Sequence, residues 1–202
     1  MVSIANCPVL KIAVVGDPGV GKTTLLRKFM REDSTLMKSK FTDIQVKYVD
    51  RNGHKVKLEI RDTAGLERHR SLTRSYYQGV TSIIFMYDVN NRDSFDNLTK
   101  WNDQYTRNCR DPVNSQTLIV GNKRQLTNDT PAVPADTARN FANHLEADFI
   151  EVSTSNSFNI DECFFRLVDN FFETHSKRQP GHSSSRVDLN SRPKYKNGYC
   201  CL

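Results

Sequence analysis

The chain has 202 residues, enough for one domain with a well-buried core, and 37% hydrophobic with 26% charged residues is typical of a soluble globular protein. No apolar run approaches the roughly 18 residues that span a bilayer, and the N-terminal stretch lacks the features of a signal peptide. The net charge of +6 is concentrated after residue 173, where six basic residues accompany one acidic residue. A basic tail on a nearly neutral body favours an anionic membrane surface over a nucleic-acid polymer.

Short apolar runs alternate with helical periodicity over the first 173 residues. Strands are predicted at residues 9–15, 44–50, 55–61, 82–88, 117–122 and 148–153. Helical stripes are predicted at 138–145 and 160–172. This alternation predicts an α/β fold, with a six-stranded, mostly parallel sheet and helices on both faces. The turn Asn52-Gly53 predicts a hairpin, which makes one edge strand antiparallel.

The predicted domain covers residues 1–175, and the predicted tail covers 176–202. The tail is rich in Ser, Pro, Gly, Asn and basic residues. Such a composition cannot bury enough apolar surface to offset its ordering entropy, so the tail is predicted to be disordered. The five cysteines are scattered without metal-ligand spacing, which indicates reduced thiols in a cytosolic protein.

A phosphate-binding loop is predicted at residues 16–23, which read GDPGVGKT and match G-x-x-x-x-G-K-[ST] between a strand and a helix. Glycines let the backbone wrap a phosphate chain closely, and the following helix adds the positive end of its dipole. Lys22 would reach the outer phosphates and the Thr23 hydroxyl would bind Mg²⁺. Pro18 fixes its φ angle and removes one N–H donor. The predicted phosphate-binding residues are Gly16, Asp17, Pro18, Gly19, Val20, Gly21, Lys22, Thr23 and Thr24.

A second phosphate-site motif, D-x-x-G, follows the strand at 55–61. Asp62 is placed to hold Mg²⁺ through water, as the acidic partner of such a loop does. Gly65 can bring a backbone N–H to the terminal phosphate. The motif is weak alone, but its position after a phosphate-binding loop and an apolar strand strengthens it.

The sequence resembles the Ras superfamily of small GTPases, and most of all its Rab branch. The resemblance covers residues 9 to about 173 and the last residues. It rests on GDPGVGKTTLL, KVKLEIRDTAG, ERHRSLTRSYYQGV, IIFMYDVNNRDSF, the lone Trp101, LIVGNK and EVSTS. The resemblance implies a GTP/GDP switch with Mg²⁺ that acts in vesicle traffic as a monomer. It also implies an exchange factor, a GDP dissociation inhibitor, a Rab escort protein, and effectors that bind the GTP-ordered segments.

Base recognition in the family uses N-K-x-D and an S-A-K-like loop. The corresponding residues here are Asn122, Lys123 and Gln125, and then Ser153, Thr154 and Ser155. The resemblance implies that Asn122 ties loops together, that the Lys123 stem packs on the purine, and that the Thr154 N–H bonds guanine O6. Gln125 departs from the family's aspartate, which accepts two hydrogen bonds from guanine. Because a glutamine amide offers one acceptor oxygen, guanine preference is expected to be weaker, although GTP stays the favoured nucleotide.

The first switch segment also departs from the family, and is about two residues short. The family has a threonine there that holds Mg²⁺ and the γ-phosphate. Counting back from Asp62 gives Ser39, whereas counting forward from Lys22 falls on Phe41, next to Thr42, so Ser39 and Thr42 both stay candidates. Arg61 replaces a tryptophan that effectors commonly contact, so ordinary effectors are not expected to bind.

Leu66 stands where the family has the glutamine that orients the attacking water. Leucine can neither donate a hydrogen bond to that water nor accept one from it. If the alignment is correct, Lys22, Gly65 and Leu66 form a catalytic set whose intrinsic hydrolysis is slow, and the switch rests mainly in its GTP form.

The chain ends Tyr199-Cys200-Cys201-Leu202. Terminal cysteine pairs resemble the substrates of Rab-type double geranylgeranylation, so Cys200 and Cys201 are the predicted lipidation sites. Two lipids and a basic tail supply the combined signals that stable anchoring needs. The expected location is the cytoplasmic face of an intracellular or plasma membrane, with a cytosolic pool.

Two other functions stay open at this point. A pseudo-GTPase scaffold that binds nucleotide constitutively or poorly is favoured by Leu66, Gln125 and the short first switch. A P-loop kinase or ATPase is disfavoured by Asn122-Lys123 and by the lack of an Arg-rich lid segment. Measured GTP turnover would distinguish the pseudo-GTPase scaffold from an active switch. Base preference would distinguish both of them from the P-loop kinase or ATPase.

Overall fold

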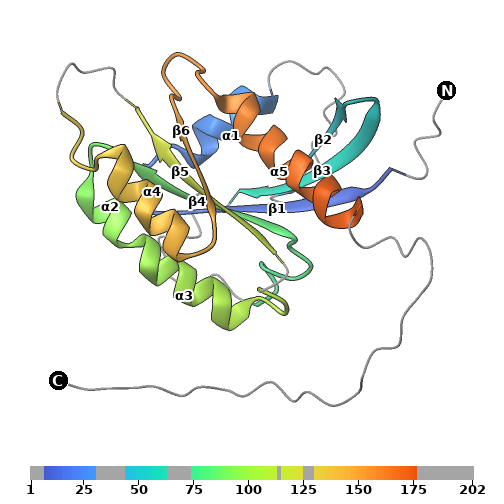
Figure 1. The fold of residues 1–202 in the computed structure, drawn as a ribbon, viewed down its shortest axis with the longest axis horizontal. Helices are drawn as coiled ribbons and strands as arrows, with labels where there is room; N and C mark the ends of the chain where they lie inside the picture. The colour runs from blue at the N-terminus through green and yellow to red at the C-terminus, as the bar shows by residue number, and fades with distance from the viewer. Residues whose placement is uncertain (1–6, 31–43, 63–73, 113–114, 125–129, 177–202) are drawn as a thin grey trace, which may run out of the picture.

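The computed structural model describes residues 7–30, 44–62, 74–112, 115–124 and 130–176. Within these residues the chain alternates between strands and helices (Figure 1). The strands are β1 Val9–Val15, β2 Ile44–Arg51, β3 His54–Asp62, β4 Ser82–Asp88, β5 Gln116–Asn122 and β6 Asp148–Val152. The helices are α1 Lys22–Met30, α2 Arg92–Asp96, α3 Leu98–Asn108, α4 Ala135–His144 and α5 Ile160–Ser176.

The six strands form one sheet in the order β2-β3-β1-β4-β5-β6. Every neighbouring pair is parallel except β2 with β3, so the predicted antiparallel edge strand is confirmed as β2. Arg51 pairs with His54 across the hairpin, and the two residues between them have positive φ angles of 53° at Asn52 and 78° at Gly53. Asn-Gly tolerates this backbone at low cost, which fixes the register of the hairpin.

Two hydrophobic cores lie on opposite faces of the sheet. Alternate residues of β1 serve each of them: Ile12 and Val14 join the core under α1 and α5, while Ala13 and Val15 join the core under α2, α3 and α4. Figure 1 shows the same division, with α1 and α5 together on one side of the sheet and α3 and α4 on the other. Because the central strands are buried on both faces, they read as continuous apolar runs rather than as alternating ones.

A buried lysine fastens the end of α1 to the edge strand. The Lys47 ammonium of β2 donates to the Phe29 carbonyl at 2.6 Å and lies 4.3 Å from the centroid of the Phe29 ring. That ring stacks on Phe164 of α5, with centroids 3.8 Å apart. A cation near the C-terminal end of a helix interacts favourably with the helix dipole. The last turn of α1 is therefore held at a fixed distance from β2.

The carboxyl ends of the parallel strands meet at one edge of the sheet. From this end of β1 the chain continues through α1 to β2 and β3, which lie on one side of β1 in the sheet. The later strands β4, β5 and β6 lie on its other side. Ligands of open α/β sheets bind in the crevice at such a topological switch point. The residues that follow or end these strands are therefore the ones that build the site.

Candidate nucleotide-binding site

The loop between β1 and α1 is folded tightly against its neighbours. Gly16 has a φ angle of 150°, and a Cβ atom there would lie 2.1 Å from the Met86 carbonyl oxygen of β4. Gly21 has a φ angle of 108°, and its Cβ would lie 2.3 Å from the Asn122 amide nitrogen. Only glycine fits these two positions, because both the backbone angle and the neighbouring polar atoms exclude a side chain. The predicted phosphate loop thus has the close packing that its sequence requires.

Lys22 begins α1 and turns its side chain back over this loop. Its ammonium donates to the carbonyls of Gly16 and Asp17, both at 2.8 Å, and the residue is only 3% exposed. A lysine held in this way places a buried positive charge at the loop, beside the N-terminus of α1. The arrangement attracts a polyanion such as a phosphate chain.

Thr23, in the first turn of α1, meets Asp62, the last residue of β3. The Thr23 hydroxyl donates to a carboxylate oxygen of Asp62 at 3.0 Å, although the residues are 39 positions apart. A hydroxyl and a carboxylate oxygen are ligands that Mg²⁺ accepts, so the donor set fits this ion. Among the residues that the structure describes, no group of three His, Cys, Asp or Glu side chains could hold a metal. Magnesium at this place would therefore need oxygen ligands from the nucleotide and water as well.

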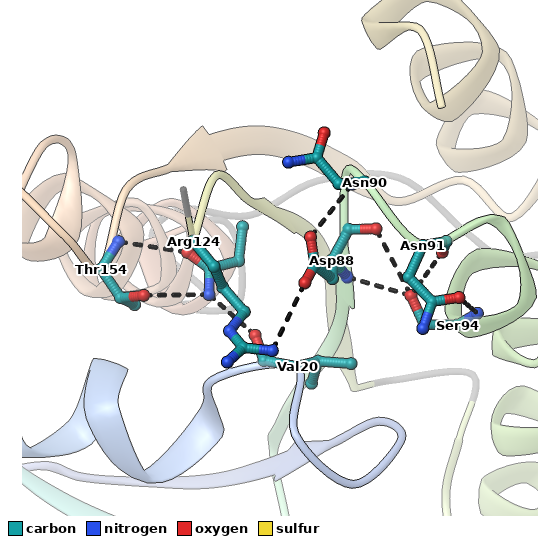
Figure 2. A network of polar contacts seen from close by, with 8 residues as sticks. Val20, Asp88, Asn90, Asn91, Ser94, Arg124 and Thr154 are labelled. Carbon is teal, nitrogen blue, oxygen red and sulfur yellow. Dashed lines mark hydrogen bonds and ion pairs between the residues drawn. The ribbon is translucent and has the colours of Figure 1, made fainter. Parts of the chain in front are cut away.

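The other end of the site is organised by Asn122, which is fully buried at the end of β5. Its amide nitrogen donates to the Val20 carbonyl at 2.7 Å and to the Thr154 hydroxyl at 3.0 Å. Its amide oxygen accepts from the Thr154 N–H at 3.1 Å. Figure 2 shows Val20 and Thr154 within one network of polar contacts. One side chain therefore joins the phosphate loop to the loop after β6.

The Thr154 N–H is thus engaged by Asn122, whereas the family resemblance assigns it to guanine O6. A backbone N–H can share its hydrogen between two acceptors, as is common at loops and helix ends. A contact between Thr154 and the base would have this three-centre form or would replace the bond to Asn122.

Lys123 and the two serines near it brace the same loop. The Lys123 N–H donates to the Val152 carbonyl at 2.8 Å, and the Ser153 hydroxyl donates to the Lys123 carbonyl at 3.0 Å. The Ser153 and Ser155 hydroxyls lie 2.8 Å apart. The Lys123 ammonium pairs with Glu151 at 2.8 Å, which orients the stem of the lysine along the end of the sheet.

Sequence reasoning missed Asp88, at the end of β4. Its carboxylate lies 3.6 Å from the Arg124 guanidinium and accepts from the Asn90 N–H at 3.0 Å (Figure 2). The signal was available, because Asp88 ends a buried parallel strand just as Asp62 does. The Asp88 ion pair links the loop after β5, which carries the base-recognition motif, to the loop after β4.

Arg61 lies at the end of β3, directly before Asp62. Its guanidinium donates to the Ser75 carbonyl at 3.4 Å and to the Tyr76 carbonyl. The Arg61 side chain is therefore a hydrogen-bond donor to the backbone ahead of β4. Seven predicted site residues lie outside the described residues: Ser39, Thr42, Gly65, Leu66, Gln125, Cys200 and Cys201.

The geometry defines a P-loop nucleotide-binding protein. A profile of the Ras family matches residues 11–173. The chain is 34% identical to "Ras-related protein RABD2a" of Arabidopsis thaliana, over 95% of each chain. It is 36% identical to "Ras-related protein Rab-1D" of Dictyostelium discoideum, over 93% of this chain and 92% of that one. It is 39% identical to "Ras-related protein SEC4" of Saccharomyces cerevisiae, over 79% of this chain and 74% of that one.

The chain belongs to the Ras family of small GTPases, and its Rab-named relatives place it in the Rab branch. Both the predicted fold and the predicted family are confirmed. In the part of the chain that the structure describes, no helix has the length and apolar character needed to cross a membrane.

Proposed function

We propose that the chain is a GTP- and Mg²⁺-dependent switch that regulates intracellular vesicle traffic. The observation that carries this proposal is that side-chain hydrogen bonds join the phosphate loop and α1 to the loop after β6 and to the end of β3. Asn122 bonds the phosphate loop and the loop after β6, while Thr23 bonds Asp62. A similar protein from Zea mays, 35% identical over 95% of each chain, carries the name "GTP-binding protein YPTM2".

The residues of the chain divide the work of binding between them. The Lys22 ammonium would exchange its carbonyl partners for oxygens of the outer phosphates. Thr23 and Asp62 would hold Mg²⁺, which neutralises charge on the phosphates when it is bound. Asn122 keeps the loops in register, and the Lys123 stem would cover one face of the purine.

We expect hydrolysis to be slow, because Leu66 has no polar atom to orient the attacking water. An activating protein that works through a glutamine at this position should fail as well. The switch would then rest mainly in its GTP form.

The alternative is a pseudo-GTPase scaffold. Two observations favour it: Gln125 offers guanine a single acceptor oxygen, and the Thr154 N–H is already engaged by Asn122. Such a protein would bind nucleotide poorly, or hold it without turnover.

The partners are expected to differ from those of ordinary Rab proteins. Arg61 puts a cation that bonds the Tyr76 carbonyl where effectors of the family contact an indole. The partners that handle the membrane anchor, by contrast, are inferred from the tail: an escort protein for prenylation, a GDP dissociation inhibitor and a membrane.

Replacing Cys200 and Cys201 with serine should make the protein soluble in cells, and persistent membrane binding would refute lipidation at this pair.

The decisive experiment is to purify the full chain from cells, denature it and identify the released nucleotide by chromatography. Mostly GTP supports a guanine-binding site with failed hydrolysis. Mostly GDP shows that turnover proceeds without a glutamine at position 66. An empty site favours the scaffold, and a site filled with adenine nucleotide contradicts both readings.

A further inference from the structure

The phosphate loop contains an acid, Asp17, whose charge opposes the binding of phosphates. At distances of a few ångströms, two like charges repel by about 1 kcal/mol in water and by more near a protein surface. Neither the P-loop motif nor the proposed function gives this carboxylate a role.

The structure turns the Asp17 carboxylate toward α3. One carboxylate oxygen accepts from the Trp101 indole N–H at 2.8 Å, and the other accepts from the Asn97 amide nitrogen at 2.7 Å. Both donors are neutral, and Asn97 and Trp101 are four positions apart, so they lie on the same side of the helix start. The Trp101 indole is only 8% exposed and belongs to the core under α2, α3 and α4.

Asn97 is itself held in the orientation that this contact needs. Its amide oxygen accepts from the Lys100 ammonium at 2.7 Å, which turns its amide nitrogen toward Asp17. Its backbone carbonyl accepts from the backbone N–H of Trp101 at 3.1 Å. The two donors to Asp17 are therefore fixed relative to each other.

The main chain of Asp17 is bound from the opposite direction. Its carbonyl accepts from the Lys22 ammonium at 2.8 Å. The carboxylate of Asp17 thus points to α3 while its carbonyl points to the lysine that would meet the phosphates. Asp17 is the link between the phosphate loop and α3.

We propose that Asp17, Asn97 and Trp101 form a latch that positions the phosphate loop and sets the rate at which nucleotide dissociates. The latch keeps the Asp17 charge out of the phosphate site and holds the backbone that faces the phosphates. Asn97 and Trp101 are positioning residues, since they act on the nucleotide through Asp17. This inference rests on the proposed nucleotide binding and extends it to α3, a helix outside the predicted phosphate- and base-binding loops.

The test measures GDP dissociation from the full chain, loaded with fluorescent GDP and chased with excess unlabelled GDP in Mg²⁺. We expect Trp101→Phe and Asn97→Ala each to speed dissociation about tenfold, the effect of losing one hydrogen bond to a charged group. Adding Asp17→Ala to either variant should slow dissociation again, because it removes the released charge. A purely structural role for the indole predicts no such rescue.

Tyr105→Phe is the matched control. Tyr105 is a buried aromatic residue on the same helix, but its hydroxyl bonds Ser115 rather than the phosphate loop. We expect dissociation at the wild-type rate. The proposal is overturned if Trp101→Phe and Asn97→Ala leave the rate unchanged, if Asp17→Ala fails to rescue them, or if Tyr105→Phe has the same effect.

Tryptophan emission gives a readout that does not require nucleotide. Trp101 is the one tryptophan of the chain, so its emission reports the latch directly. We expect Asp17→Ala to shift the emission maximum of the nucleotide-free protein, whereas Lys28→Ala, which removes a lysine bonded to Ser155, should not. An emission shift without GDP binding would retain the latch contact but refute its role in dissociation together with the proposed function; unchanged emission would refute the latch alone.

Discussion

The two ends of the nucleotide site are built in different ways. At the base end, Asn122 makes three hydrogen bonds to Val20 and Thr154, and all of these residues are buried. At the phosphate end, Lys22 and Thr23 bond to the loop and to Asp62, which are partners that a phosphate chain and Mg²⁺ would replace. At the base end the Asn122 amide bonds join protein groups to one another, whereas binding at the phosphate end would exchange one set of contacts for another. A switch needs this asymmetry, because only the phosphate end differs between GTP and GDP.

The largest effect is expected from Asn122→Ala at the base end. It removes three hydrogen bonds and leaves the buried Val20 carbonyl without this donor, which should lower the free energy of unfolding by about 2–4 kcal/mol. Urea unfolding of the full chain measures it. Thr23→Ala at the phosphate end is the comparison, with an expected loss of about 1 kcal/mol or less. Equal losses would show that the two ends do not differ in the way that the hydrogen bonds indicate.

The next effect concerns the chemistry of the phosphate end. Leu66→Gln should raise single-turnover phosphate release on the order of a hundredfold, since general-base and water-positioning groups contribute effects of this size. The control is Leu66→Ala, which should leave the rate as it is because alanine also lacks a polar group. An unchanged rate in the glutamine variant would mean that Leu66 does not limit hydrolysis.

A smaller change is expected from Gln125→Asp at the base end. An aspartate restores a charge-assisted acceptor for guanine, worth about 1.5–3 kcal/mol, so GDP binding should tighten roughly ten- to a hundredfold. Titration with GDP and IDP separates the cause, since IDP lacks the exocyclic amine and should gain less. Equal gains for both nucleotides would contradict recognition of that amine.

The smallest expected effect is a loss of stability at alkaline pH. It comes from buried titratable groups in the two hydrophobic cores, which lie beneath both ends of the site. Burial raises the pKa of the Cys163 thiol from 9.0 to about 12, and it also raises the pKa of the Tyr77 and Tyr87 hydroxyls. In the unfolded chain these groups lose their protons at lower pH than in the folded chain. The stability they contribute is therefore present below about pH 9 and is lost as the pH rises toward 12.

Urea unfolding at about pH 8 and about pH 10 checks this sign. Stability should be lower at the higher pH. A higher or equal value at alkaline pH would show that these buried groups do not control the pH dependence.

The strands and the hairpin could be predicted from the sequence because their signals are local. The run at 9–15 gave β1 with the same bounds, since glycine ends it, and Asn52-Gly53 fixed the hairpin through its own backbone preferences. The weaker stripe of α3, where Trp101 and Tyr105 stand among polar residues, left that helix without predicted bounds.

Contacts between distant residues could not be predicted in the same way. Asp17 bonds to Asn97 and Trp101, which lie 80 and 84 positions away in the sequence. No pattern within the phosphate loop predicts these partners. The Arg61 bond to the Tyr76 carbonyl likewise depends on how the strand end and a later turn are placed. The residue types of the site followed from motifs, whereas the bonds that hold them required the fold.

The bond between Lys47 and the Phe29 carbonyl bears on the first switch segment, which the family resemblance predicts to be about two residues short. It fixes both ends of the chain that runs from the end of α1 to β2, whatever the sequence between them. The entropy of closing such a loop depends only logarithmically on its length, so two residues fewer change it by about 0.1 kcal/mol. A shortening of this size is therefore expected to be nearly neutral for folding. The predicted consequence would instead fall on which of Ser39 and Thr42 serves as the Mg²⁺ ligand.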